Sequence, residues 1–247
     1  MGIMKTMEEN SIDLTVTSPP YDNLRTYNGN NDLWNEQVWK DTIKELYRLT
    51  KDGGVVVWVV GDATIKGSET GTSFKQALHA MDCGFKLHDT MIWHKQNAMP
   101  QVDKSRFCQS FEYMFIFSKG KPKTTNILKT PTKNGGKYLS RGDGNSENMN
   151  KKGGNIVSME RISFNVYNLN VGGKNNGHPA TFPEKLAHDH ILSWSNEGDT
   201  VFDCFMGSGT TGKVAKQLDR NFIGIELDPE YCKIAQARID AINYTTD

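Results

Sequence analysis

The residues best suited to chemistry lie in the short stretch Thr17-Ser18-Pro19-Pro20-Tyr21, after the apolar run Ile12–Val16, which predicts a buried strand. Two prolines cannot continue a sheet, because each lacks an N–H and has a fixed φ, so a stiff turn must follow. A hydroxyl (Ser18), a rigid carbonyl (Pro19) and an aromatic ring (Tyr21) then meet at one point. They suit the exocyclic amine of a flat ring, since both oxygens accept its hydrogens and the aromatic ring can stack. The alternative interpretation of these five residues is an ordinary Pro-Pro loop in which the tyrosine only packs against its neighbours.

A second candidate site lies in the last fifty residues. We expect a strand over Thr200–Phe205, the glycine-rich turn Gly207-Ser208-Gly209-Thr210-Thr211-Gly212, a helix over Lys213–Leu218 and a strand over Asn221–Leu227. The final helix is expected over Asp228–Ile242, with Pro229 in its first turn. The order strand, glycine turn, helix, strand and acid indicates a nucleotide-binding α/β unit.

The acidic residues of this unit indicate which class of nucleotide it binds. The turn is neither a P-loop nor the full dinucleotide fingerprint. Asp203 before the turn would repel a pyrophosphate but attract an α-amino cation, and Glu226 could accept both ribose hydroxyls. S-adenosylmethionine, a nucleoside that carries an amino acid, fits these features better than a dinucleotide does. The residues expected to bind it here are Asp203, Phe205, Gly207, Ser208, Gly209, Thr210, Thr211, Glu226 and Leu227.

Other elements must bring these two stretches to one edge of a sheet, because open α/β sheets bind ligands at the carboxyl ends of their strands. The hydrophobic periodicity predicts these elements. Helices are expected to end near Asn10 and to cover Trp34–Thr50, Thr72–Met81 and Glu184–Trp194; further strands are expected over Ser11–Thr17, Val55–Val60, Phe85–His94 and Phe111–Phe117.

Residues 119–176 have a different composition. Gly, Asn, Ser and Lys dominate, and 11 Lys or Arg residues stand against 3 Asp or Glu. The segment is either a solvated insertion or a surface that follows a phosphate backbone. In the second case the candidate DNA contacts are Lys133, Lys137, Arg141, Lys151, Lys152 and Arg161.

Composition sets outer bounds. The 247 residues carry no net formal charge at pH 7, and their number suits one large α/β domain with an insertion. No run of about 18 apolar residues occurs, so no membrane helix is expected. The four cysteines are scattered without CxxC spacing, which indicates reduced thiols in a cytoplasmic protein and no metal site.

Four motifs in sequence order resemble those of the β-arrangement amino-group DNA methyltransferases, in which a target-recognition region separates the catalytic half from the cofactor half. Residues 17–21 match the catalytic motif. The other matches are Ser110-Phe111-Glu112-Tyr113 through Ser118-Lys119-Gly120, His178-Pro179-Ala180-Thr181-Phe182-Pro183-Glu184, and Asp203 through Thr211 with Ile225-Glu226. Each motif is moderately specific, and four in this order are highly specific. The resemblance covers nearly the whole chain.

The resemblance implies a Rossmann-like methyltransferase fold: a mixed, mostly parallel sheet with helices on both faces and a basic, loop-rich insertion. Residues 1–118 would be the catalytic half, 119–176 the target-recognition insertion and 177–247 the cofactor-binding half of the same domain. Thr17, His178, Pro179, Thr181, Phe182 and Pro183 would join the cofactor site, while Ser18, Pro19, Pro20 and Tyr21 would be catalytic. Partners would be double-stranded DNA and, because family members are often dimers, a second copy of the chain. The source would be a bacterium or a phage in a bacterial host.

One departure from the family pattern concerns the N-terminal end. Family members usually begin with a further strand ending in Gly-Asp, whereas only Met1-Gly2-Ile3 precedes the matching segment Met4–Asn10. The acid that meets the adenine of the cofactor therefore cannot be assigned. Either the sheet is one strand short, another chain covers its edge, or the natural chain is longer.

The expected reaction is methyl transfer to the exocyclic amine of a flipped-out base in DNA. In the family, Ser before Pro-Pro-Tyr is associated mainly with cytosine N4, and Asp or Asn with adenine N6. Ser18 therefore favours N4-cytosine, with N6-adenine as the alternative. More distant alternatives are an RNA or protein-glutamine methyltransferase, against which the basic insertion argues, and an inactive DNA-binding relic.

Overall fold

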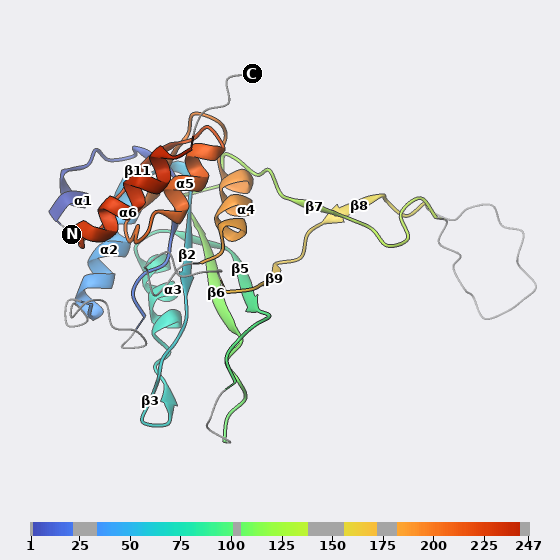
Figure 1. Ribbon diagram of the computed structural model, residues 1–247, viewed down its shortest axis with the longest axis horizontal. Coiled ribbons are helices and arrows are strands. Elements are labelled where there is room, and N and C mark those ends of the chain that lie inside the picture. Colours follow the sequence, from blue (N-terminus) through green and yellow to red (C-terminus); the bar gives the residue numbers. More distant parts are fainter. Residues whose placement is uncertain (1, 22–33, 101–104, 138–155, 172–181, 243–247) are drawn as a thin grey trace, which may run out of the picture. The chain divides into compact units, whose positions relative to one another are not determined.

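Seven strands form one mixed sheet in the order β11-β10-β1-β2-β6-β5-β9 (Figure 1). The computed structural model describes residues 2–21, 34–100, 105–137, 156–171 and 182–242. β6 pairs antiparallel with both of its neighbours, and all other neighbouring pairs are parallel. The strands are β1 (Ile12–Thr17), β2 (Thr50–Val60), β5 (Lys86–Lys95), β6 (Phe111–Ser118), β9 (Val166–Leu169), β10 (Thr200–Asp203) and β11 (Asn221–Gly224).

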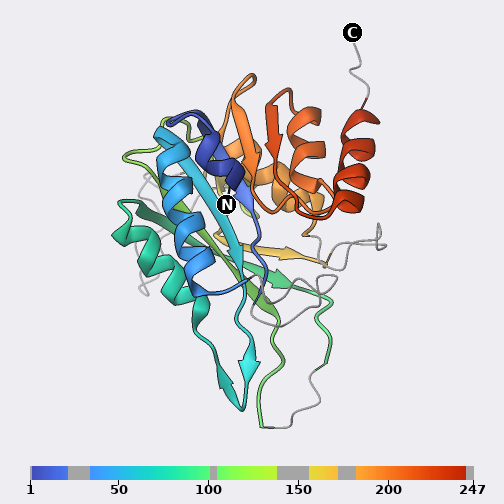
Figure 2. The same ribbon diagram turned by 90° about the vertical axis from the view of Figure 1, so that its left-hand side faces the viewer.

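Helices of the described residues cover both faces of this sheet (Figure 2). One face carries α1 (Gly2–Thr6), α2 (Glu36–Leu49) and α3 (Thr72–Asp82), and the other carries α4 (Glu184–Trp194), α5 (Thr210–Gln217) and α6 (Pro229–Asp240). Alternate side chains of β2 point to opposite faces, so Val56, Trp58 and Val60 pack with α2 and α3, while Val55, Val57 and Val59 pack with α4 and α5. The part of β2 that is buried on both faces, Val55–Val60, is apolar throughout, as the sequence predicted. The predicted α/β fold with helices on both faces is confirmed.

The first residues of two elements differ from the sequence prediction by three residues or more, and the strands predicted to end at Phe205 and Leu227 end earlier, at Asp203 and Gly224. β2 begins at Thr50 rather than Val55, because Gly53 takes a φ of +79° and exchanges backbone hydrogen bonds with Lys119 and Lys123. Gly53 and Gly54, which lie between the ranges predicted for the helix and the strand, are therefore part of the strand. α5 begins at Thr210 rather than Lys213, because Gly209 is its N-cap.

A small hairpin was missed by the sequence prediction. β3 (Thr64–Ile65) and β4 (Ser68–Glu69) pair antiparallel after the carboxyl end of β2. The turn consists of Lys66 and Gly67, which have φ values of +49° and +79°. Two positive φ values suit a tight hairpin turn, and strands of two residues leave no periodic pattern to detect.

The chain divides into two compact units, residues 1–126 with 165–247, and residues 127–164. The expected insertion 119–176 therefore contributes to both, and its β9 pairs with β5 in the large sheet. In the smaller unit, β7 (Lys129–Pro131) pairs antiparallel with β8 (Glu160–Ile162). Large apolar side chains are exposed in its described part, namely Ile127, Ile156, Met159, Ile162 and Phe164. Backbone hydrogen bonds, rather than a buried core, hold that part together.

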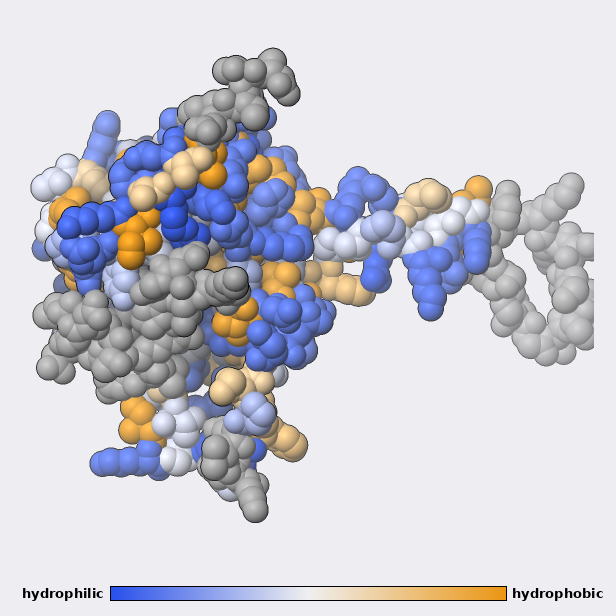
Figure 3. Space-filling view, in the orientation of Figure 1, coloured by the Kyte–Doolittle hydropathy of each residue, from blue (hydrophilic) through white to orange (hydrophobic). Residues whose placement is uncertain are grey.

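On the face seen in Figure 3, apolar residues occur in small separate groups on a hydrophilic background. Among the described helices, none combines the length and the apolar character needed to cross a bilayer.

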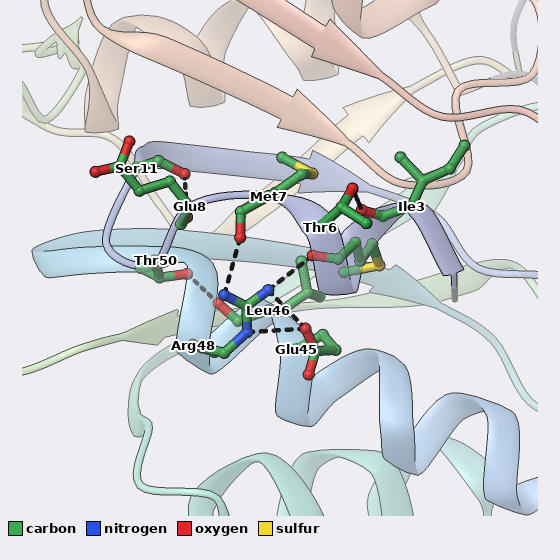
Figure 4. A network of polar contacts seen from close by, with 10 residues as sticks. Ile3, Thr6, Met7, Glu8, Ser11, Glu45, Leu46, Arg48 and Thr50 are labelled. Atoms are coloured by element: carbon green, nitrogen blue, oxygen red, sulfur yellow. Dashed lines mark hydrogen bonds and ion pairs between the residues drawn. The ribbon is translucent and has the colours of Figure 1, made fainter.

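Arg48, in the last turn of α2, anchors the N-terminal segment (Figure 4). Its guanidinium donates to the carbonyl oxygens of Met4 at 2.7 Å and Met7 at 3.0 Å, and to the carboxylate of Glu45. Arginine can satisfy three acceptors at once, because its donors form a fixed planar fork. This contact holds α1 against α2 immediately before the chain enters β1.

Replacing Arg48 by methionine is expected to lower the free energy of unfolding by about 2 kcal/mol, because two carbonyl oxygens and a carboxylate lose a charged donor. Urea unfolding measures the loss, and hydrogen exchange of residues 2–7 should accelerate. The matched control is Lys40→Met in the same helix, which breaks an exposed pair with Glu36 and a 5.7 Å cation–π contact with the Trp39 ring and should have a much smaller effect. Equal losses in the two variants would contradict the anchoring role.

Candidate active site

The stretch after β1 forms a compact polar group. Pro19 is buried, while Ser18, Pro20 and Tyr21 are partly exposed. The Ser18 hydroxyl lies 3.1 Å from the Tyr21 hydroxyl, and the latter donates to Glu112 Oε2 at 2.5 Å. Tyr21 also packs against the core cluster beneath α2 and α3. The tyrosine ring is therefore held at its base by packing and at its tip by hydrogen bonds.

Asp203 joins this stretch to the glycine-rich turn. Its carboxylate accepts from Thr17 Oγ1 at 2.6 Å, Thr211 Oγ1 at 2.8 Å and the Phe205 N–H at 3.1 Å. The strands that carry Thr17 and Asp203, β1 and β10, are parallel neighbours. The turns that follow them therefore start side by side at the same edge of the sheet, as the sequence predicted for the two candidate stretches.

The surroundings of Asp203 differ from what its proposed contact with an α-amino cation requires. The side chain is only 2% exposed, and burial raises its pKa to about 6, against the lowering effect of the hydrogen bonds from Thr17 and Thr211. Its three donors belong to the protein. Through these hydrogen bonds Asp203 connects the turn after β1 to the glycine-rich turn after β10.

The raised pKa predicts how stability depends on pH. Between the unperturbed value near 4 and the folded value near 6, the folded chain binds more protons than the unfolded chain, so the free energy of unfolding falls as pH rises. Asp203→Asn removes this titration. The stability of the wild type relative to this variant should therefore fall by about 2.4 kcal/mol from pH 4 to pH 7, as measured by urea unfolding across that range. A difference that does not change with pH would contradict the burial of an ionisable Asp203.

Glu226, after β11, organises the opposite side of the glycine-rich turn. Oε2 accepts from the Gly207 N–H at 2.8 Å, and Oε1 accepts from the N–H groups of Leu227 at 2.8 Å and Asp228 at 3.0 Å. A carboxylate offers about four acceptor positions, so these contacts leave about one for a ligand hydroxyl. Accepting both ribose hydroxyls, as the sequence suggested, would require sharing that position or releasing a backbone N–H.

The glycines of the turn serve packing as well as ligand approach. Gly207 and Gly209 have φ values of +51° and +79°. A Cβ on Gly209 would lie 2.8 Å from Ala235 Cβ, so this glycine also allows α6 to approach the turn. Ser208 is buried and accepts from Arg238 at both its carbonyl oxygen and its hydroxyl. Thr210 is buried in the first turn of α5.

The remaining predicted site residues are placed as follows. Phe205 makes an edge contact with Trp34, with ring centroids 5.3 Å apart, and Leu227 is 74% exposed beside Glu226. Phe182 packs partly against the core, and Pro183 is the N-cap of α4. His178, Pro179 and Thr181 lie outside the described residues.

The candidate DNA contacts fall on the smaller unit. Lys133, Lys137 and Arg161 lie in its described part, where the Arg161 guanidinium stacks 4.0 Å from the centroid of the Phe164 ring. Arg141, Lys151 and Lys152 lie outside the described residues. DNA binding by these six residues remains a prediction.

Two residues of the candidate site received no role in the sequence analysis. Glu112 on β6 is 5% exposed and accepts from Tyr21, while Lys95 at the end of β5 forms an ion pair with its other oxygen. A signal for them existed, because Glu112 is the one acid in the otherwise apolar run 111–117 and a buried carboxylate needs partners. The partner itself, from another strand, could not be read from spacing.

The residues present fit an amino-acid nucleoside. The glycine-rich backbone approaches the carboxyl edge of the sheet, an acid follows the neighbouring strand, and the exposed Leu227 offers apolar surface beside that acid. The described residues contain no cluster of three or more His, Cys, Asp or Glu that could hold a metal ion.

Comparisons with known proteins agree with this geometry. A family model described as DNA methylase of the N6/N4 type matches residues 12–237. The orphan methyltransferase M.BamHII of Bacillus amyloliquefaciens is 52% identical over 94% of this chain and 92% of its own length. The solved PvuII DNA methyltransferase (cytosine-N4-specific) has the same fold, with a TM-score of 0.72 at 23% identity over 99% of this chain and 84% of that one.

A second solved structure bears on the cofactor. A DNA modification methylase of Thermus thermophilus, described as putative and determined in complex with S-adenosyl-L-methionine, is 25% identical over 97% of this chain and 90% of that one, with a TM-score of 0.64. The family match, the close relative and the glycine-rich turn with its acid agree. The chain belongs to the N6/N4 family of DNA methylases, and its cofactor is S-adenosylmethionine.

Proposed function

We propose that this enzyme methylates the exocyclic N4 amine of cytosine in double-stranded DNA, at a specific site and on a flipped-out base. The observation that supports the choice of base is the Ser18 hydroxyl, which stands at the carboxyl end of β1 within reach of Tyr21. Ser in this position is associated mainly with cytosine in the family that the chain resembles. N6-adenine has the same chemistry and is the alternative outcome.

The proposed site acts mainly by positioning. A paired base hides its amine in the stack, so the target must be everted at a cost of a few kcal/mol. The Pro19 carbonyl and the Ser18 hydroxyl accept the two amine hydrogens, and the Tyr21 ring stacks on the base. Because the Tyr21 hydroxyl is bound to Glu112, the plane of that ring is fixed before the base arrives.

The two acceptors also change the reactivity of the amine. In free cytosine the N4 lone pair is delocalised into the ring. Hydrogen bonds to Pro19 and Ser18 draw the nitrogen out of planar conjugation and direct its lone pair toward the methyl group. The cofactor supplies that electrophilic methyl on a sulfonium. The amine nitrogen would form a bond to that methyl while the C–S bond breaks and sulfur keeps the electron pair, and the nitrogen would then lose a proton to solvent.

DNA affinity is assigned to the basic residues of the segment 119–176. Lys133, Lys137 and Arg161 can neutralise phosphates, which positions the duplex without reading its sequence. The Arg161–Phe164 pair presents a flat cationic surface that suits a phosphate or a base edge. The target-recognition role of this segment, and a homodimer of the enzyme, belong to the same proposal.

Sequencing that detects modified bases, applied to DNA from cells that express the chain, tests the proposal. We expect N4-methylcytosine at one short recurring sequence, and a much smaller methylated fraction of those sites in cells that carry a Ser18→Ala variant. N6-methyladenine at a recurring sequence would replace the assigned base and leave the DNA methyltransferase assignment in place. DNA without any new methylated amine would contradict the proposed reaction.

A further inference from the structure

Four side chains, from two strands and the catalytic turn, form one polar chain beside the proposed base site. Lys95 Nζ pairs with Glu112 Oε1, the Tyr21 hydroxyl donates to Glu112 Oε2 at 2.5 Å, and the Ser18 hydroxyl lies 3.1 Å from the Tyr21 hydroxyl. Glu112 is 5% exposed, and the Lys95 side chain is 17% exposed. Charged groups this deeply buried are strongly coupled to their partners.

The chemistry of these groups gives the chain a direction. The Lys95 ammonium can only donate and the Glu112 carboxylate can only accept, whereas each hydroxyl has one proton and can do both. Tyr21 gives its single proton to Glu112. At the contact with Ser18 the phenol oxygen must then accept, so the proton of Ser18 points to Tyr21.

This direction determines what the Ser18 oxygen offers to a base. A serine hydroxyl by itself can rotate and present either a proton or a lone pair. With its proton committed to Tyr21, Ser18 presents lone pairs, which accept from an amine and repel a carbonyl oxygen. We propose that Glu112 and Lys95 are positioning residues that set Ser18 as a fixed hydrogen-bond acceptor, and that they thereby select an amino-bearing base over a keto base. This inference rests on the proposed function.

Glu112→Gln tests the direction. The glutamine amide oxygen must face the Lys95 ammonium, so its NH₂ donates to the Tyr21 hydroxyl oxygen. The Tyr21 proton is then donated to the Ser18 oxygen, which reverses the hydrogen bond between the two hydroxyls. Ser18 then points its proton at the amine. We expect kcat to fall about 30-fold, with the dissociation constant of S-adenosylmethionine unchanged within about twofold. Glu197→Gln, an exposed acid in the loop before β10, is the matched control and should keep wild-type kcat.

Tyr21→Phe provides the decisive comparison, because it keeps the ring but removes the phenol. Ser18 can then rotate, and we expect a smaller loss of about 5-fold in kcat. In the double variant Glu112→Gln with Tyr21→Phe, the reversed proton can no longer reach Ser18. The double variant should therefore be about 6-fold faster than Glu112→Gln alone. Additive losses, or a double variant slower than either single one, would overturn the inference.

A binding measurement extends the test to Tyr21→Phe alone, in case the Glu112 variants fail to fold. Oligonucleotides carry either the target cytosine or uracil, its keto counterpart, with hypoxanthine replacing adenine if the intact enzyme methylates adenine. We expect the wild type to prefer the amino base about 10-fold and Tyr21→Phe to lose most of that preference. An unchanged preference would overturn the inference. Absence of methyl transfer by the wild type would instead contradict the proposed function.

Discussion

Replacing Ser18 by alanine is expected to lower kcat by about 10²–10³-fold, the range measured when one prearranged hydrogen-bonding group is removed from a reacting centre. The variant leaves the amine held by the Pro19 carbonyl alone. Its lone pair then stays partly conjugated and is poorly aimed at the methyl group. Because Ser18 is proposed to contact the base rather than the cofactor, the dissociation constant of S-adenosylmethionine should change less than about twofold.

A control variant separates this effect from damage to the strand. Ser11, just before the opposite end of β1, donates to the Glu8 carbonyl oxygen at 2.7 Å. Ser11→Ala should retain kcat within about twofold. Steady-state kinetics on duplex DNA measure kcat, and calorimetry measures cofactor binding. A Ser18→Ala enzyme with near wild-type kcat would remove the hydroxyl from the proposed mechanism.

Replacing Glu226 by glutamine is expected to raise the dissociation constant of S-adenosylmethionine about 100-fold. Both carboxylate oxygens accept backbone N–H groups, so one end of a glutamine amide must direct its NH₂ at another donor. The glycine-rich turn then loses its tie to β11 at Gly207, and the ligand loses a charged acceptor. Hydrogen bonds to charged groups contribute about 1.5–3 kcal/mol each, which accounts for the expected size.

Glu230→Gln, four residues further along, is the matched control for this prediction. Glu230 forms an exposed pair with Lys233 on α6, and its loss should leave cofactor binding unchanged. Calorimetric titration with S-adenosylmethionine distinguishes the two variants. At saturating cofactor, Glu226→Gln should retain kcat within about threefold, because the groups that face the base are intact. A dissociation constant within about threefold of wild type would contradict the role of Glu226.

The elements of this fold could be predicted where periodicity is strong. The helical spacing of Trp39, Ile43 and Leu46 marked α2, and the unbroken valines marked a strand buried on both faces. The predicted start of β2 was wrong because Gly53 lies within the strand rather than in a turn before it. Gly53 continues β2 through backbone contacts with residues 119–123, which lie far away in the sequence. No local pattern carries that information.

The candidate site was predictable in its parts but not in its connections. The resemblance placed Ser18, Gly207 and Glu226 in the site, and adjacent parallel strands bring their turns to one edge. The sequence could not show that Asp203 would be enclosed by Thr17 and Thr211, since that depends on which strands become neighbours. The further strand ending in Gly-Asp with which family members usually begin has no counterpart among the described residues, where β11 is one edge strand of the sheet and β9 is the other.

The most direct test of the account uses the purified chain, duplex DNA containing its target sequence and S-adenosylmethionine with a deuterated methyl group. After digestion, mass spectrometry of the nucleosides identifies the atom that received the label. We predict deuterated N4-methylcytosine, formed about 10²–10³-fold more slowly by the Ser18→Ala variant. Deuterated N6-methyladenine alone would contradict the assigned base, and DNA without label would contradict a methyl-transfer site built from Ser18, Tyr21 and the glycine-rich turn.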